Sequence, residues 1–494
     1  MDEPLLWAGT FACALGAATG LAPPLGRRAR FAALAAAVLL APVLVIADAW
    51  DSARIADLRE QPALLVAGAL AATAAIAALA WAFRRRPGWL APALVAAMPF
   101  RVPIDLGGGD ANLLLPLYAV IAGGLAAAAI GAGRDRRPAA EPADRGPWLG
   151  AVGWALAGIV VLYALQAAYA DDLTAALQGV AFFLTPFAAL YALLADARWD
   201  RPALRAVVWV LVAEGLAFLL VGLVEYGARE LLWNDKVISG NEAHTYFRVN
   251  SLFWDPNILG RYLAVTMTVL AAVVAYSDRA REVRAAAAAF GLLAVLLLIT
   301  FSQTSTLALL AALLVLAATR WGLARAAAGA AATALALAAA VALIAGGGLS
   351  GETTSGRAGL IDGGVEIARD HPLAGVGSGG FAAEFTARYY EGEGFAAESH
   401  TEPVTVAAEQ GAVGLFAYAA LLAVTVGGLL SAAGLELRGR ARGPALAATL
   451  LAVYALMVVH SLGYAAFLTD PITWSVLAIA AALSPAPRPG RGSG

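Results

Sequence analysis

Residues 62–86, PALLVAGALAATAAIAALAWAFRRR, contain the pattern that decides the fold. An unbroken apolar run from 62 to 83 is followed directly by three arginines, Arg84 to Arg86. About 20 apolar residues in a helix cross the roughly 30 Å hydrocarbon core of a bilayer. This stretch therefore predicts a membrane-spanning helix with a positively charged end.

The same pattern recurs along the whole chain. Of the 494 residues, 61% are hydrophobic and 14% are charged, and the mean hydropathy is +0.75. A soluble domain is about 45–50% apolar and about 25% charged. We predict an all-α, polytopic integral membrane protein, a single domain over 1–494 with about fifteen spans. The spans are expected near 5–23, 31–49, 62–83, 89–104, 112–132, 148–168, 176–195, 206–226, 256–276, 285–301, 304–319, 326–346, 403–432, 443–466 and 472–484.

The arginine clusters predict the orientation of these spans. Each cluster follows an odd-numbered span, as at 27–30, 84–86 and 134–145. The positive-inside rule then puts the N-terminus outside and the C-terminus in the cytoplasm. Two large loops, 227–255 and 347–401, are expected on the outer face. Because membrane orientation accounts for the basic clusters, nucleic-acid binding is not expected.

Several classes of protein are disfavoured by what the sequence lacks. It has no nucleotide-binding P-loop, and its four histidines, His244, His371, His400 and His460, are too scattered for a metal site. No metal or other cofactor is therefore expected. A transporter is weakly disfavoured, because ionisable residues within the spans are few and no repeat between the halves is visible.

The end of the first outer loop contains the first candidate site residues. Arg248 and Arg261 lie on the outer side, against the charge bias, and an arginine near the membrane is costly without an anionic partner. A guanidinium binds phosphate bidentately, so phosphate is the natural partner. Asp255-Pro256-Asn257 is typical of a capped helix start, and Asn257 is a weaker candidate for ligand binding.

The second outer loop, 347–401, is the long polar segment of the chain and the expected catalytic loop. Arg357 opens an amphipathic stretch that predicts a helix lying on the membrane surface. The glycine-rich turn at 375–381 is interpreted as a helix stop or a close-packing site, which needs no ligand.

His400 lies three residues before Pro403, where the next span starts, so it is expected at the N-terminus of a helix, where anions bind favourably. Glu398 and Glu402 flank it and can orient the imidazole ring or raise its basicity. The alternative is an interfacial histidine without a catalytic role.

Several of these motifs together resemble the O-antigen ligase and O-antigen polymerase superfamily. The family pattern is an arginine, an "h-P-L-x-G-x-G" turn, a "H-N" pair and an "E-x-G-x-x-G" helix. This chain has Arg357, then His371-Pro372-Leu373-Ala374-Gly375-Val376-Gly377, His400, and Glu409-Gln410-Gly411-Ala412-Val413-Gly414. Upstream, Arg248, Phe253, Pro256-Asn257 and Tyr262 resemble the motif "R…f…P-N…y", and His460-Ser461 with Asp470-Pro471 resembles the closing segment. The resemblance covers about residues 246–478.

Two positions depart from the family pattern. Thr401 replaces the usual Asn after the histidine, and Phe301-Ser302-Gln303-Thr304-Ser305 stands where many members have Ser-Arg. Any role of that family arginine is therefore in doubt here, whereas the set of Arg248, Arg357 and His400 is unaffected.

The resemblance implies a GT-C-type glycosyltransferase of the bacterial inner membrane. Such an enzyme transfers a glycan from undecaprenyl diphosphate to a sugar hydroxyl on the outer face, with inversion and without a metal. Arg248, Arg357 and the weaker candidate Arg261 would hold the diphosphate, and His400 would act as general base. We lean slightly to a polysaccharide polymerase, with a chain-length regulator as a possible partner protein. The alternatives are a ligase that uses lipid A-core as acceptor and a flippase of lipid-linked glycans.

Overall fold

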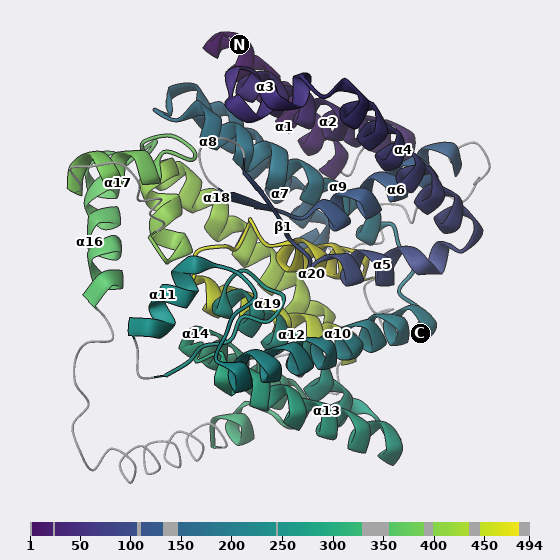
Figure 1. Ribbon diagram of the computed structural model, residues 1–494. Coiled ribbons are helices and arrows are strands. Elements are labelled where there is room, and N and C mark those ends of the chain that lie inside the picture. The colour runs from purple at the N-terminus through teal and green to yellow at the C-terminus, as the bar shows by residue number, and fades with distance from the viewer. Residues whose placement is uncertain are drawn as a thin grey trace, which may run out of the picture. The chain divides into compact units, whose positions relative to one another are not determined.

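The structure is a computed structural model that describes residues 2–22, 25–105, 110–131, 147–243, 246–328, 355–389, 399–433 and 445–483. It is built almost wholly of helices, which confirms the predicted all-α polytopic class (Figure 1). Within the described ranges, ten helices are long and apolar enough to cross a membrane, and four shorter apolar helices accompany them. The count of fifteen spans stays a prediction, and most of the predicted span 326–346 lies outside the described residues.

The chain forms two compact units. The first comprises Met1–Val210, Phe416–Ala432 and Leu468–Gly494. Its long helices are apolar, as the sequence predicts, and in one of them the π-helical segment Gly179–Leu184 joins α8 to α9. The helices of this unit are α1 (Glu3–Leu21), α2 (Arg27–Asp48), α3 (Ala53–Arg59), α4 (Pro62–Arg85), α5 (Leu90–Ala97), α6 (Leu115–Gly131), α7 (Pro147–Gln166), α8 (Leu173–Gln178), α9 (Thr185–Ala195) and α20 (Pro471–Ala482).

One short sheet interrupts this helical unit. Strands β1 (Val102–Asp105) and β2 (Asp110–Leu113) pair antiparallel, with Val102 opposite Leu113. The sequence analysis placed residues 102–104 at the end of a span. The helix ends earlier because Pro103 and the β-branched residues Val102 and Ile104 favour an extended backbone.

The second unit comprises Leu211–Leu415 and Ala433–Phe467 and contains every candidate site residue. It includes the greater part of α10 (Arg201–Ala228) and the first half of α18 (Glu402–Ala432). Its other helices are α11 (Asp235–Ala243), α12 (Pro256–Tyr276), α13 (Ala280–Ile299), α14 (Gln303–Trp321), α16 (Ser355–Asp370), α17 (Phe381–Tyr389) and α19 (Ala445–Ser461).

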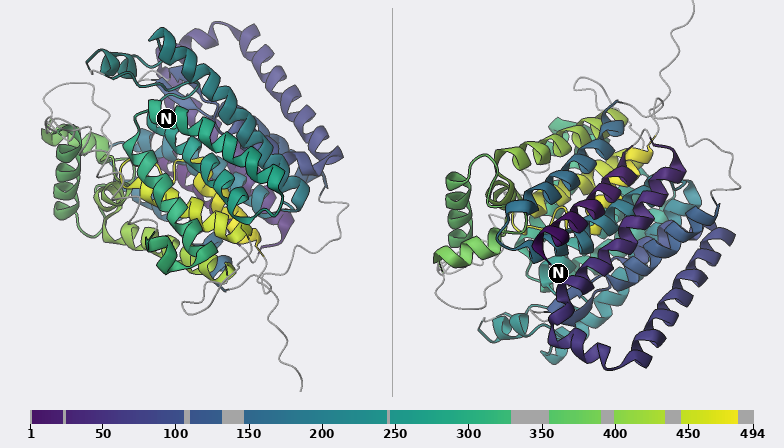
Figure 2. Two further views of the ribbon diagram at one scale, coloured as in Figure 1. Left: turned by 90° about the horizontal axis from the view of Figure 1, so that it is seen from below. Right: turned by 90° about the horizontal axis from the view of Figure 1, so that it is seen from above.

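Helix α12 lies at the centre of the second unit. It packs against α13, α14 and α19, and the views in Figures 1 and 2 show α12, α13 and α14 side by side. Gly260 permits this approach, because a Cβ there would lie 2.6 Å from the hydroxyl oxygen of Ser305 on α14. The close contact brings the first turns of α12 and α14 together, and these turns carry polar residues.

Candidate active site

The segment that precedes α12 is held by a carboxylate. Glu225, near the end of α10, accepts hydrogen bonds from the backbone N–H groups of Ser251 at 2.7 Å and Asn250 at 3.2 Å. Ser251 has a positive φ of 49° and donates its hydroxyl to the carbonyl of Phe218. These contacts fix the backbone directly after Arg248.

The guanidinium of Arg248 is oriented by two acceptors from different elements. Its Nε donates to the carbonyl of Thr300 at 2.9 Å, and its Nη2 donates to Oδ1 of Asn257 at 3.3 Å. The backbone of Arg248 is fixed as well, because the side-chain amide of Asn241 bonds to both its N–H and its carbonyl. The side chain is half-buried, so this cation is positioned and still reaches the surface of the unit.

Asn257 lies in the first turn of α12, next to the predicted cap. Asp255 caps the helix by accepting from the backbone N–H of Asn257 at 2.6 Å, which confirms the capped helix start. The amide of Asn257 has a second role, because its Oδ1 accepts from Arg248 and also from the hydroxyl of Ser302 at 2.9 Å.

Buried hydroxyls and a histidine continue from Ser302. Its Oγ lies 2.7 Å from the Oγ of Ser305, which lies 3.1 Å from Nε2 of His460 on α19. Ser305 and His460 are fully buried and Ser302 is 2% exposed. The sequence analysis did not select Ser302, Ser305 or His460 as site residues. The available signal was a group of hydroxyl residues between two apolar spans and a histidine at the end of a third.

Arg261 is placed one turn further along α12. It is 2% exposed, and its guanidinium carbon lies 5.6 Å from the ring centroid of Tyr464. Tyr464 is also close to His460, with ring centroids 5.9 Å apart. Arg261 therefore lies deeper than Arg248, among the side chains around His460.

The glycine-rich turn of the large loop is bound to a kink in α18. The kink is at Gly411, where φ is +61° and ψ is −159°. Four backbone hydrogen bonds of 2.9–3.3 Å join the two segments: Val376 N to Ala408 O, Gly377 N to Glu409 O, Ala412 N to Pro372 O and Val413 N to Leu373 O. The kink leaves backbone groups of α18 without helical partners, and the turn supplies those partners.

Two glycines permit this docking. Gly375 has a φ of +70°, and a Cβ there would lie 2.2 Å from the backbone carbonyl of Glu409. A Cβ at Gly411 would lie 2.4 Å from the carbonyl of Leu373. The motifs around Gly375 and Gly411 are therefore the two halves of one structural element, which agrees with the close-packing interpretation of the turn.

Helices α16 and α17 form a small outer layer on the start of α18. The amphipathic stretch is helical, as predicted, but its apolar face packs on protein. Ile367, Phe381, Phe385 and Ala408 form a buried cluster. This face contacts α17 and α18, and the position of α16 on a membrane surface stays a prediction.

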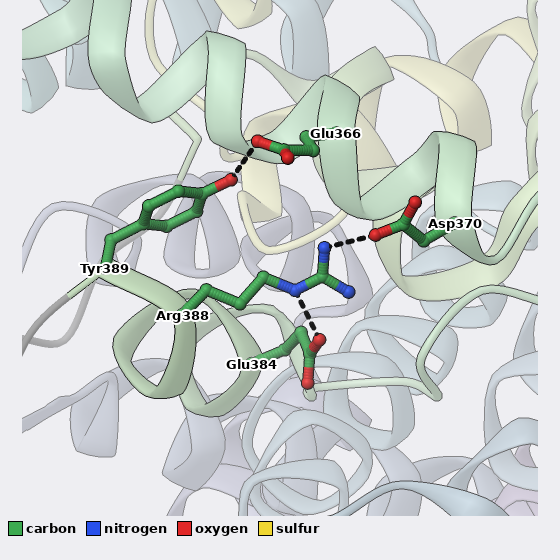
Figure 3. Close-up of polar contacts among 5 residues, drawn as sticks. All are labelled: Glu366, Asp370, Glu384, Arg388 and Tyr389. Atoms are coloured by element: carbon green, nitrogen blue, oxygen red, sulfur yellow. Dashed lines mark hydrogen bonds and ion pairs between the residues drawn. The ribbon is translucent and has the colours of Figure 1, made fainter.

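The polar rim of this layer is a set of charge-assisted contacts. Figure 3 shows Arg388 of α17 bonded to Asp370 of α16 and to Glu384 of its own helix, and Tyr389 bonded to Glu366. The bond to Asp370 is the chief cause that raises the pKa of Arg388. This network joins α16, where Arg357 is found, to α17. The side chain of Arg357 lies outside the described residues.

His400 lies two residues before the start of α18, near the helix N-terminus that the sequence predicts. Its φ is +60°, a left-handed conformation that is uncommon for a residue other than glycine. The neighbouring backbone is fixed by the buried Ser399, whose hydroxyl contacts the carbonyl of Thr401 and the hydroxyl of Thr405, both at 2.7 Å. Glu402 is 9% exposed and accepts from the backbone N–H of Phe467 at 2.9 Å. Glu398 lies outside the described residues.

One short segment joins the two groups of candidate residues. His460, at the end of α19, contacts Ser305, and Phe467 contacts Glu402 at the start of α18. Residues 460–467 therefore link the Arg248 and Asn257 group to the helix that follows His400. The ends of elements predicted to face outward thus meet within the second unit.

Comparison with known proteins supports a family resemblance for one part of the chain. Residues 288–419 match the family described as O-antigen ligase, an interval that begins in α13 and ends in α18. A search of curated proteins found no match. The matched interval includes Ser302, Ser305, Arg357 and His400 and both halves of the glycine element. This match supports the resemblance of the chain to the O-antigen ligase and polymerase superfamily.

Proposed function

We propose that this protein is a glycosyltransferase that takes a glycan from undecaprenyl diphosphate and passes it to a sugar hydroxyl. The reaction would take place on the outer face of the bacterial inner membrane. The observation that carries the proposal is the position of Arg248, whose guanidinium is held by Thr300 and Asn257 next to a region of the O-antigen ligase family.

The positioned cation suits the leaving group of this reaction. Negative charge grows on the diphosphate as the glycosidic bond breaks, so a fixed guanidinium stabilises the transition state more than the ground state. The first turns of α12 and α14 add their N–H dipoles near Arg248. Arg248 and Arg357 are the proposed diphosphate ligands, and the buried Arg261 is the weaker candidate.

His400 is the proposed general base. A sugar hydroxyl is a poor nucleophile until a base takes its proton as the new bond forms. His400 lies at the start of a helix whose preceding backbone is fixed by Ser399, so its position is well defined. Glu398 or Glu402 would orient the ring. Direct displacement would invert the anomeric centre, with no covalent enzyme intermediate and no metal.

The acceptor distinguishes two forms of this function. A polymerase would use another lipid-linked glycan and would work with a chain-length regulator, whereas a ligase would use lipid A-core. We favour the polymerase, on the high number of spans that the sequence predicts and on the lack of any recognisable acceptor feature. A flippase of the same lipid-linked glycans would not need a base at His400.

The test is an assay of the purified protein with undecaprenyl-diphosphate glycan in vesicles. We expect release of undecaprenyl diphosphate together with a longer or newly linked glycan whose anomeric configuration is inverted. Movement of the donor between leaflets without covalent change would identify a flippase. Retained anomeric configuration would contradict direct displacement.

A further inference from the structure

A row of hydrogen-bonded side chains ends on Asn257. It consists of the buried residues Ser302, Ser305 and His460, and the chemistry of the groups indicates which atom donates the proton in each contact. A guanidinium only donates, so the atom of Asn257 that faces Arg248 has to be the oxygen, Oδ1. An amide oxygen only accepts, so Ser302 donates its single proton to the same Oδ1.

The hydroxyl of Ser305 has two acceptors in reach. It lies 2.7 Å from Oγ of Ser302, whose own proton is already used, and 3.3 Å from the backbone carbonyl of Asn257. The shorter contact favours donation to Ser302, and both contacts tie Ser305 to Asn257. Ser305 then accepts from Nε2–H of His460 at 3.1 Å. His460 Nδ1 has no hydrogen-bond partner within the described ranges, in agreement with a neutral ring that has its proton on Nε2.

This row fixes the rotation of the Asn257 amide. Both donors approach Oδ1, so the Nδ2 group points away from Arg248 and Ser302. Among the described residues, the hydrogen bonds of the Asn257 side chain are these two to Oδ1. Asn257 therefore presents two N–H donors next to an oriented guanidinium, a combination suited to the oxygens of a phosphate.

We propose that Ser302, Ser305 and His460 are positioning residues that hold Asn257 as a second donor to the diphosphate of the lipid carrier. The inference rests on the proposed function for the identity of the ligand. His460 acts through the two serines and does not touch the ligand.

The test is a double-mutant cycle read by binding of undecaprenyl diphosphate to the purified full-length protein. Ser305→Ala should weaken binding roughly 3–10-fold in the parent protein, the usual worth of one hydrogen bond, and should have no further effect in Asn257→Ala. A merely structural effect of Ser305 would be additive. Equal binding by Ser305→Ala, or an additive loss, would overturn the proposal.

Substitution of His460 tests whether this residue donates a hydrogen bond to Ser305. Gln retains an N–H donor that reaches Ser305, so His460→Gln should bind within about twofold of the parent, whereas His460→Leu should show the same loss as Ser305→Ala. Thr268→Ala is the matched control, because this buried hydroxyl of α12 donates within its own helix, to the carbonyl of Ala264. A Gln variant as weak as the Leu variant would contradict the assigned direction.

The binding measurement separates this proposal from the proposed function. If Ser305 and Asn257 are coupled in binding but the protein transfers no glycan, the positioning role is supported and the proposed glycosyltransferase function is rejected. If the protein transfers glycan but Ser305 and Asn257 are not coupled, only the positioning role of the row is rejected. A parent protein that does not bind undecaprenyl diphosphate would overturn both.

Discussion

At the scale of single residues, Arg248 shows why this position requires a guanidinium. Its Nε and Nη2 donate to two acceptors on different elements, Thr300 and Asn257. A lysine carries a point charge on a flexible stem and lacks the planar arrangement of donors that holds both acceptors. The positive charge would survive in a lysine variant, but its orientation would not.

We therefore expect Arg248→Lys to lower kcat/KM for the lipid-linked donor about 10–100-fold, the usual worth of a charged hydrogen bond. Arg248→Ala should be more severe. The matched control is Arg279→Lys, because Arg279 is exposed and pairs with Glu282 in the first turn of α13. Steady-state kinetics at equal protein levels provides the measurement, and a fully active lysine variant would remove Arg248 from the site.

His400 combines a proposed chemical role with an unusual backbone. An alanine at φ +60° is strained, whereas asparagine tolerates this conformation. We expect His400→Asn and His400→Ala to lose about 10²–10⁴ in turnover, the usual worth of a general base, while both still bind the donor. Single-turnover assays with a binding measurement separate these effects. Activity in the asparagine variant would show that His400 matters only through its backbone.

At the scale of elements, the large loop and α18 form one structural feature. The turn that contains Gly375 supplies hydrogen bonds to the backbone that Gly411 opens, and each glycine leaves room for the other segment. The docked turn leads directly into α17, where the N–H of Phe381 donates to the carboxylate of Glu409 at 3.3 Å. The family motifs on both segments are thus explained by packing.

We expect Gly375→Ala and Gly411→Ala each to destabilise the protein by roughly 1–3 kcal/mol, because a methyl group would collide with backbone in a left-handed conformation. Gly359→Ala on α16 is the control, since a Cβ there meets nothing within 4 Å and alanine favours a helix. Thermal unfolding in detergent measures the difference. A stable, active Gly375→Ala variant would contradict this packing.

At the scale of the whole molecule, apolar length and charge predicted most of the helical framework. α12 spans Pro256–Tyr276, the same bounds as the predicted span, because Asp255 and Pro256 mark its start. The β hairpin was missed because its strands are short and lie between apolar runs. The contacts of Asn257 with Ser302 and of Ser305 with His460 were also missed. These partners are far apart in the chain, and no local pattern pairs them.

The predicted orientation of the chain is open to a direct test. The sequence has one cysteine, Cys13, which is fully buried, so a Cys13→Ser protein is a suitable background for labelling. Two exposed positions of the second unit lie on opposite predicted sides: Arg369 in the large loop and Asp278 after α12. We expect a membrane-impermeant maleimide to label Arg369→Cys in intact spheroplasts and Asp278→Cys only after lysis, because the positive-inside rule places the arginines near Asp278 in the cytoplasm. The opposite result would place α16, α17 and His400 in the cytoplasm, and a donor glycan on the outer face would then be out of reach.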